Sequence, residues 1–176
     1  AMVGRSNVGK STLINALCRK KVARTSAAPG KTRLANVYRV SAEGGAGRPG
    51  RWSAYLVDLP GFGYARGGED SAAELGAVAA AYMQARPTAL LLVDSRHPGL
   101  ESDAAAARWL DGLGVPRHIV ATKIDKLSRS ERARNLKTIE DVFGTAAVPV
   151  SATSGEGLDL LWTTIATIAR DVEPRG

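Results

Sequence analysis

Residues 4–11 read Gly-Arg-Ser-Asn-Val-Gly-Lys-Ser and match the phosphate-binding pattern G-x-x-x-x-G-K-[ST]. Its glycines let the backbone turn so that successive N–H groups point at one phosphate. In such a loop Lys10 reaches the outer phosphates and the Ser11 hydroxyl ligates Mg²⁺. Residues 12–17 are expected to start a helix whose positive end faces the anion. The octet predicts a nucleotide site, while the alternative is a chance match in a flexible glycine loop.

Composition limits the remaining possibilities. The 176 residues, 44% hydrophobic and 23% charged, predict one globular domain over residues 1–176. We expect a cytoplasmic protein, because no apolar run of membrane-spanning length and no secretion leader is visible. The formal net charge of +7 favours a polyanionic partner. Basic residues cluster at 19–24, 31–33 and 126–137, which favours contact with RNA or the ribosome, and not DNA, over an evenly solvated basic surface.

Strand-length apolar segments alternate with longer helical ones along the chain. This alternation predicts an α/β fold, a mostly parallel sheet with helices on both faces. We expect strands at 34–41, 52–58, 89–93, 117–122 and 147–151, and helices at 12–17, 71–85, 102–110, 128–143 and 158–170. The glycine-rich connector 43–50 reads as a hairpin tip.

The segment before the phosphate loop is unusual. A phosphate loop normally follows a buried central strand, yet only Ala1, Met2 and Val3 precede Gly4. We therefore expect the first strand to be largely missing, through either a fragment or a trimmed sequence. A domain without this strand should be unstable, because both neighbouring strands would keep unpaired backbone groups.

Further segments suit a guanine-nucleotide switch. Asp58-Leu59-Pro60-Gly61 follows a predicted strand, where the carboxylate can hold Mg²⁺ through water and the Gly61 N–H can sense a γ-phosphate. Thr32 lies in the polar loop between the first helix and the next strand, where it can complete the Mg²⁺ shell when γ-phosphate is present. The alternative for Thr32 is an ordinary turn residue.

The segment 122–125, Thr-Lys-Ile-Asp, is the most discriminating of these signals. Asp125 can accept two hydrogen bonds from the N1 and N2 donors of guanine, whereas adenine offers an acceptor at N1 and nothing at position 2. The Lys123 stem can lie along the base and ribose. Ser151-Ala152, before the last predicted helix, can present a backbone N–H to guanine O6.

Taken in this order, the motifs resemble those of the EngB (YihA or YsxC) family, within the TrmE-Era-EngA-EngB-septin-like GTPases. The resemblance covers essentially the whole chain. It is carried by the phosphate loop, 23–26 with 29–32, Asp-Leu-Pro-Gly-Phe-Gly-Tyr-Ala at 58–65, Val-Asp-Ser-Arg-His at 93–97 and the segment 122–125. It implies a three-layer P-loop GTPase (Ras-like) fold and a monomeric protein that binds GTP and GDP. It also implies a role in assembling the large ribosomal subunit, through contact with that subunit or its rRNA, and in normal cell division and septation.

The resemblance also implies roles for particular residues. Metal contacts are expected from Ser11, Thr32 and Asp58, and catalytic contributions from Asn7, Lys10, Thr32 and Gly61. The nucleotide is expected to be contacted by Gly4, Arg5, Ser6, Asn7, Val8, Gly9, Lys10, Ser11, Gly30, Lys31, Thr32, Arg33, Leu34, Asp58, Leu59, Pro60, Gly61, Thr122, Lys123, Ile124, Asp125, Val150, Ser151 and Ala152.

Hydrolysis is the part of the function that the motifs support least. Phe62 follows Gly61, so the glutamine that orients the attacking water in Ras-like enzymes is missing at that position, and intrinsic GTP hydrolysis should be slow. Asn7 resembles the asparagine with which relatives hold a K⁺ ion against the phosphates; a loop-stabilising hydrogen bonder is the alternative. Two functions stay open, a GTP hydrolase and a non-catalytic, nucleotide-gated ribosome-binding module. Asp125 disfavours a third, an ATP-dependent kinase.

Some remaining residues suggest structure rather than chemistry. Arg96 and His97 stand before a Pro-Gly pair, so we expect them to shape a turn. Trp109 and Trp162 have apolar neighbours on predicted helices and are expected in the core, whereas Trp52 fits either a core or a base-stacking position.

Overall fold

A six-stranded sheet organises the molecule, in the order β2-β3-β1-β4-β5-β6. The computed structural model describes residues 1–23, 35–43, 50–61 and 77–171. β2 pairs antiparallel with β3, and the other pairings are parallel. The strands are β1 (Met2–Gly4), β2 (Asn36–Glu43), β3 (Arg51–Asp58), β4 (Ala89–Asp94), β5 (Arg117–Thr122) and β6 (Val148–Pro149). The mostly parallel sheet that the alternation predicts is confirmed.

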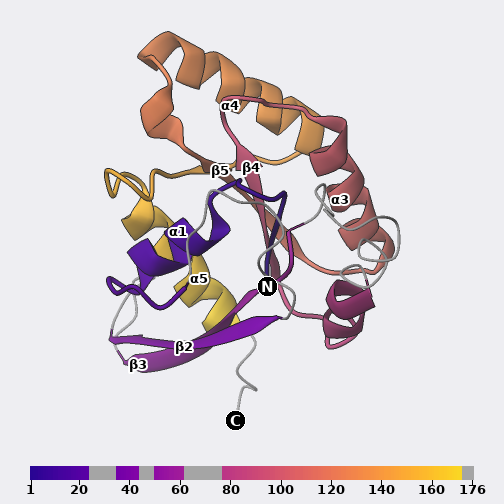
Figure 1. The fold of residues 1–176 in the computed structure, drawn as a ribbon, viewed down its shortest axis with the longest axis vertical. Coiled ribbons are helices and arrows are strands. Elements are labelled where there is room, and N and C mark those ends of the chain that lie inside the picture. The colour runs from indigo at the N-terminus through magenta and orange to yellow at the C-terminus, as the bar shows by residue number, and fades with distance from the viewer. Residues whose placement is uncertain (24–34, 44–49, 62–76, 172–176) are drawn as a thin grey trace.

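Helices cover both faces of the sheet (Figure 1). Helix α1 (Lys10–Leu17) and helix α5 (Leu158–Asp171) pack on one face, against Leu90, Leu92 and Val120. Helices α3 (Glu101–Gly112) and α4 (Arg129–Phe143) and the helical residues 77–83 lie on the other, around Leu91 and Val93. Because successive side chains of β4 point to opposite faces, this fully buried strand supplies both cores. The fold is therefore the three-layer α/β arrangement that the resemblance implies.

β1 is short but takes the central position of the sheet. Met2–Gly4 pair with Leu90–Leu92 of β4, and Met2 also pairs with Asp58 of β3. The strand is short, as expected, and its three residues lie between β3 and β4. Met2 and Val3 are buried, one in each core, and the adjoining Leu59 and Leu90 N–H groups bond to the Met2 and Ala1 carbonyls.

Local signals explain where several elements begin and end. α4 starts after a capping box, in which the Ser128 hydroxyl accepts from the Glu131 N–H while the Glu131 carboxylate accepts from the Ser128 N–H. It ends at Gly144, whose φ of 70° is the left-handed conformation that glycine tolerates. No helix in the described part of the chain is long and apolar enough to span a membrane.

The predicted elements are present with shifted limits. β2 extends to Glu43, β6 is only two residues long, and the predicted helix 71–85 is described only from residue 77, where it is helical to 83. A 3-10 helix at Ile124–Lys126 was not expected; it follows Lys123, whose φ of 61° ends the extended run of β5.

Of the two tryptophans predicted to lie in the core, Trp162 packs against it and Trp109 does not. The core prediction for Trp109 is wrong, because its side chain is 37% exposed on the outer side of α3. Trp162 packs at the margin of the core, with its ring centroid 5.7 Å from that of the buried Trp52.

Candidate functional site

The phosphate loop runs from the end of β1 to the start of α1, as its motif predicts. Gly4 lies so close to its neighbours that an added Cβ would be 2.9 Å from Val8 Cγ1 and 3.0 Å from the Leu92 carbonyl oxygen. Gly9 has a φ of 110°, which a residue with a side chain rarely adopts. The first and last glycines are thus required for close packing and for backbone conformation, and α1 begins directly at Lys10.

Lys10 folds back across its own loop. Its Nζ donates to the Gly4 carbonyl at 3.1 Å and to the Arg5 carbonyl at 3.5 Å, and the residue is 8% exposed. Burial lowers the pKa of Lys10, and the nearby Asp58 carboxylate opposes that effect. A buried ammonium whose partners among the described residues are carbonyl oxygens is suited to an anionic ligand, since a phosphate oxygen offers a stronger, charge-assisted hydrogen bond.

Asp58 ends β3 beside Ser11 with one acceptor unused. The Ser11 hydroxyl donates to Asp58 Oδ2 at 3.4 Å, while Oδ1 is buried and has no hydrogen-bond partner among the described residues. Burial raises the pKa of Asp58, and Lys10 and Ser11 counteract it. A carboxylate beside a hydroxyl, with a buried unpartnered oxygen, is the hard oxygen donor set that Mg²⁺ takes. The residues present fit that cation, directly or through water.

Gly61 closes over the same point. A Cβ at this position would lie 2.9 Å from Lys10 Nζ and from the Ser6 backbone nitrogen. The chain after β3 therefore approaches the phosphate loop closely enough to share a ligand. The structure brings together Lys10, Ser11, Asp58 and Gly61, as predicted. Outside the described residues lie Gly30, Lys31, Thr32, Arg33, Leu34 and Phe62.

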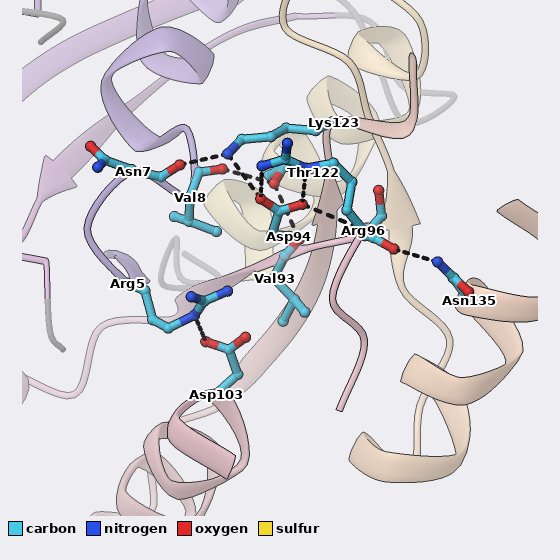
Figure 2. A network of polar contacts seen from close by, with 11 residues as sticks. Arg5, Asn7, Val8, Val93, Asp94, Arg96, Asp103, Thr122, Lys123 and Asn135 are labelled. Carbon is cyan, nitrogen blue, oxygen red and sulfur yellow. Dashed lines mark hydrogen bonds and ion pairs between the residues drawn. The ribbon is translucent and has the colours of Figure 1, made fainter. Parts of the chain in front are cut away.

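The end of β5 is bonded to the phosphate loop (Figure 2). The Thr122 hydroxyl lies 2.8 Å from the Val8 carbonyl and 3.2 Å from the Val93 carbonyl. Lys123 Nζ donates to the Asn7 carbonyl at 2.6 Å and to Asp94 Oδ2 at 2.9 Å. The segment predicted to meet the base thus holds the loop predicted to meet the phosphates.

Asp94 is the acceptor at the centre of this network (Figure 2). Arg96 donates to it from Nε at 3.0 Å, from Nη2 at 2.7 Å and from its backbone N–H at 3.1 Å. Burial opposes ionisation of Asp94, yet the hydrogen bonds from Arg96 and Lys123 hold its pKa well below the usual range. The sequence analysis did not identify Asp94 as a site residue, and it expected Arg96 only to shape a turn. Asp94 could have been found from its position, because it is an acidic residue at the end of a fully buried strand.

Asp125 lies in the 3-10 helix after Lys123. Hydrogen bonding to Ser151 lowers its pKa, and Lys126 Nζ is 3.3 Å from its Oδ2. The carboxylate is therefore ionised and can accept from two donors of a base. Ser151 is fully buried and its N–H donates to the Glu156 carbonyl at 2.9 Å. Of the pair predicted to face guanine O6, only the Ala152 N–H is left without a partner in the described chain.

Arg5 has a structural partner. Its Nε donates to Asp103 Oδ1 of α3 at 2.9 Å, and Asp103 is fully buried. Burial raises the pKa of Asp103, against the Arg5 charge. The side chain of Arg5 thus points to α3, which leaves its backbone for a phosphate.

Asn7 has a φ of 64°, and its backbone carbonyl accepts from Lys123. Its side-chain amide is exposed and makes no hydrogen bond to any described residue.

Comparison with known proteins agrees with this geometry. A family model described as "50S ribosome-binding GTPase" matches residues 1–123. The probable GTP-binding protein EngB of Chlorobaculum tepidum is 43% identical over 174 residues, covering 96% of this chain and 85% of the relative. That of Thermotoga maritima is 38% identical over 178 residues, covering 97% of this chain and 86% of the relative.

Solved structures extend the match to three dimensions. A crystal structure of a probable GTP-binding protein engB matches with a TM-score of 0.71 at 23% identity, and the match covers 97% of each chain. At this identity the match supports the fold alone. A single-substitution variant of Aquifex aeolicus Era bound to GDP.AlF4- has a TM-score of 0.83 at 26% identity, covering 99% of this chain. This chain spans 56% of that Era chain. An Era complex with MgGDPNP and nucleotides 1506-1542 of 16S ribosomal RNA gives a TM-score of 0.81 at 26% identity, covering 99% of this chain and 57% of the Era chain. Together the phosphate loop, the order of the motifs and the relatives show that this chain belongs to the EngB family of GTP-binding proteins.

Proposed function

We propose that this protein binds GTP and GDP with Mg²⁺, hydrolyses GTP slowly and acts as a nucleotide switch in assembly of the large ribosomal subunit. The observation that carries the proposal is the buried Asp58 Oδ1, which has no partner among the described residues and lies beside Ser11, Lys10 and Gly61. An unpaired buried carboxylate oxygen is costly, so a ligand that supplies a cation there is favoured.

Each group has a proposed role. Lys10 binds the outer phosphates, Ser11 and Asp58 hold Mg²⁺ and Thr32 completes its shell in the GTP state. Bound Mg²⁺ would neutralise charge on the β- and γ-phosphates. Asp125 accepts from the guanine N1 and N2 donors, and the Ala152 N–H donates to O6.

Slow hydrolysis follows from Phe62 in place of a glutamine. We propose that Asn7 holds a K⁺ ion near the phosphates, as its exposed amide, unpartnered within the described chain, allows. Hydrolysis should then be faster in K⁺ than in Na⁺, and equal rates in the two salts would remove K⁺ from the proposal.

The ribosomal role is supported by the family description and by the rRNA in the Era complex. We place the protein in the cytoplasm as a monomer that contacts rRNA of the large subunit and is needed for normal cell division.

The second candidate is a nucleotide-gated ribosome-binding module with incidental hydrolysis, which the absence of a glutamine after Gly61 favours. Turnover stimulated by ribosomal particles separates the two, because only the hydrolase requires it.

The first experiment is Mg²⁺-dependent binding of GDP, a slowly hydrolysed GTP analogue and ATP by calorimetry. Losing two charge-assisted hydrogen bonds should lower the guanine affinity of Asp125→Ala at least about a hundredfold. Asp159→Ala, an exposed carboxylate in the first turn of α5, is the matched control and should bind like the unaltered protein. Equal ATP and GDP affinity, or indifference to Asp125→Ala, would remove the guanine switch.

A further inference from the structure

The exposed face of the β2–β3 hairpin holds the two most exposed large apolar side chains of the described residues. Tyr55 is 65% exposed and Val37 is 58% exposed. Arg39 pairs directly with Tyr55 across the two strands, and Val37 stands two residues before Arg39, so all three point to one face. The tyrosine ring is therefore open to solvent beside an arginine, where a flat group can stack on it.

This region is also basic. Arg39 and Arg51 on the hairpin, and Arg19, Lys20 and Lys21 after α1, are exposed. Within the described part of the chain, none of these five side chains has a hydrogen bond or ion pair. The carboxylate exposed on the two strands is that of Glu43, opposite Arg51 in the register. Positive charge therefore exceeds negative charge, and it is free to meet a polyanion.

A groove runs along the outer edge of β2, which pairs only with β3 among the described strands. It has a volume of about 500 Å³ and lies between the end of α1, the 39–42 segment of β2 and Trp162 of α5. Arg19 and Arg39 line it, together with Leu17. The edge-to-face contact between Trp52 and Trp162 holds the indole in place. Arg39 thus borders both the groove and the face with Tyr55. We call this whole region, from Arg19 and Trp162 across β2 to Tyr55 and Arg51, the β2 surface.

Aromatic rings beside unpaired arginines and lysines are how proteins bind single-stranded nucleic acid, with bases on the rings and phosphates on the cations. An obligate protein interface would have fewer charges at its centre. A duplex offers no unstacked base to Tyr55.

We propose that the β2 surface binds a single-stranded segment of RNA. One base stacks on Tyr55, the strand passes over the open edge of β2 beside Arg39, and a later base enters the groove by Trp162 on the side of the sheet that carries α1 and α5. Arg19 and Arg39 hold the phosphates. This inference rests on the proposed ribosomal role and names its RNA contact.

The test is fluorescence anisotropy with a labelled mixed-sequence RNA of about 12 nucleotides, a length within the usual site size of single-strand binders, used single-stranded or annealed to its complement. Tyr55→Ser should weaken single-strand binding about tenfold, since stacking is worth about 1–3 kcal/mol per base, while Tyr55→Phe keeps the affinity. Arg39→Gln should reduce the slope of log K against log salt concentration by about 0.7, and Tyr55→Ser should leave that slope unchanged. Arg108→Gln, an exposed arginine on α3 outside the three basic clusters, controls for loss of net charge.

The same variants are assayed for GDP binding and for association with ribosomal particles. If Tyr55→Ser and Arg39→Gln bind RNA like Arg108→Gln, or if the duplex binds as well as the single strand, the inference is overturned. If the two variants lose ribosomal particles but keep RNA affinity, the partner is a protein and the RNA assignment is wrong. In both cases unchanged GDP binding leaves the nucleotide switch standing. Only a failure of the unaltered protein to bind GDP would count against that function.

Discussion

Replacing Asp94 by asparagine tests whether the network around Lys123 supports nucleotide binding. Asp94 Oδ1 accepts from two Arg96 nitrogens, and Oδ2 accepts from Arg96 Nη2 and from Lys123 Nζ. Asparagine keeps the shape but retains one acceptor oxygen, and its NH₂ group would face donors. At least two of the four hydrogen bonds are lost. With the NH₂ group at the Oδ2 position, Lys123 keeps only the Asn7 carbonyl as a partner within the described chain.

The magnitude follows from the environment of the three groups. A hydrogen bond to a charged group contributes about 1.5–3 kcal/mol. The Asp94 side chain is 5% exposed, but those of Arg96 and Lys123 are 41% and 27% exposed, so solvent recovers part of the loss. We expect Asp94→Asn to lower the free energy of unfolding by about 1–3 kcal/mol. GDP affinity should fall about tenfold through faster dissociation, because Lys123 is the one partner of Asp94 in the described chain that is proposed to contact the nucleotide.

The pH dependence has a defined sign. The pKa of Asp94 is lowered in the folded protein, so its ionised form stabilises the fold above the pKa of the unfolded chain. The stability difference between the unaltered protein and Asp94→Asn should be constant near neutrality. It should shrink as the pH falls through the acid range below about 4. Urea unfolding at several pH values measures it.

A double-mutant cycle with Lys123→Met separates positioning from general destabilisation. If Asp94 acts through Lys123, the second substitution should cost little GDP affinity once the first is present. The control is Asp111→Asn, which breaks a bidentate pair with Arg117 on the surface, with contacts of 2.7 and 3.0 Å. It should leave GDP dissociation unchanged. Additive losses for Asp94→Asn and Lys123→Met would refute the reasoning.

Other substitutions probe the phosphate side and the packing of α4. Gly61→Ala puts a Cβ 2.9 Å from Lys10 Nζ, so titration should show weaker binding of a GTP analogue with little change for GDP. Asp58→Asn removes a buried charge whose pKa burial raises, so thermal unfolding without nucleotide should shift upward while Mg²⁺-dependent GTP-analogue binding falls. Asn135→Ala loses the 2.9 Å hydrogen bond to the buried Ser95 carbonyl and should cost about 1–3 kcal/mol in urea unfolding.

The sequence predicted the parts of the site that sit in contiguous strings. The phosphate loop, Asp58 with Gly61, and Thr122–Asp125 each lie at the end of a strand, and parallel strands end at one edge of the sheet. Their meeting therefore follows from the α/β pattern alone. The network around Asp94 could not be predicted in this way. The partner that links Asp94 to the site is Lys123, which follows the neighbouring strand β5 and not β4.

Contacts between distant segments were the least predictable. Arg5 and Asp103 are 98 positions apart, and nothing in either local pattern marks them as partners. The prediction for Trp109 was wrong for a related reason. Its alanine-rich neighbours make several sides of α3 look apolar, so the sequence does not reveal which side faces solvent.

The two sides of the site differ in how far they are prepared for a ligand. Thr122 and Lys123 hold the Val8 and Asn7 carbonyls, so the loop is fastened on its base side by side chains of the protein itself. On the phosphate side, Asp58 keeps a buried oxygen without a partner in the described chain and Lys10 rests on backbone carbonyls. Preorganisation on the base side lowers the cost of ordering when nucleotide binds. The unsatisfied groups on the phosphate side are those whose free energy a phosphate and a cation can change, so differences between GTP and GDP should be expressed there, at Asp58 and Gly61, and not at Asp125.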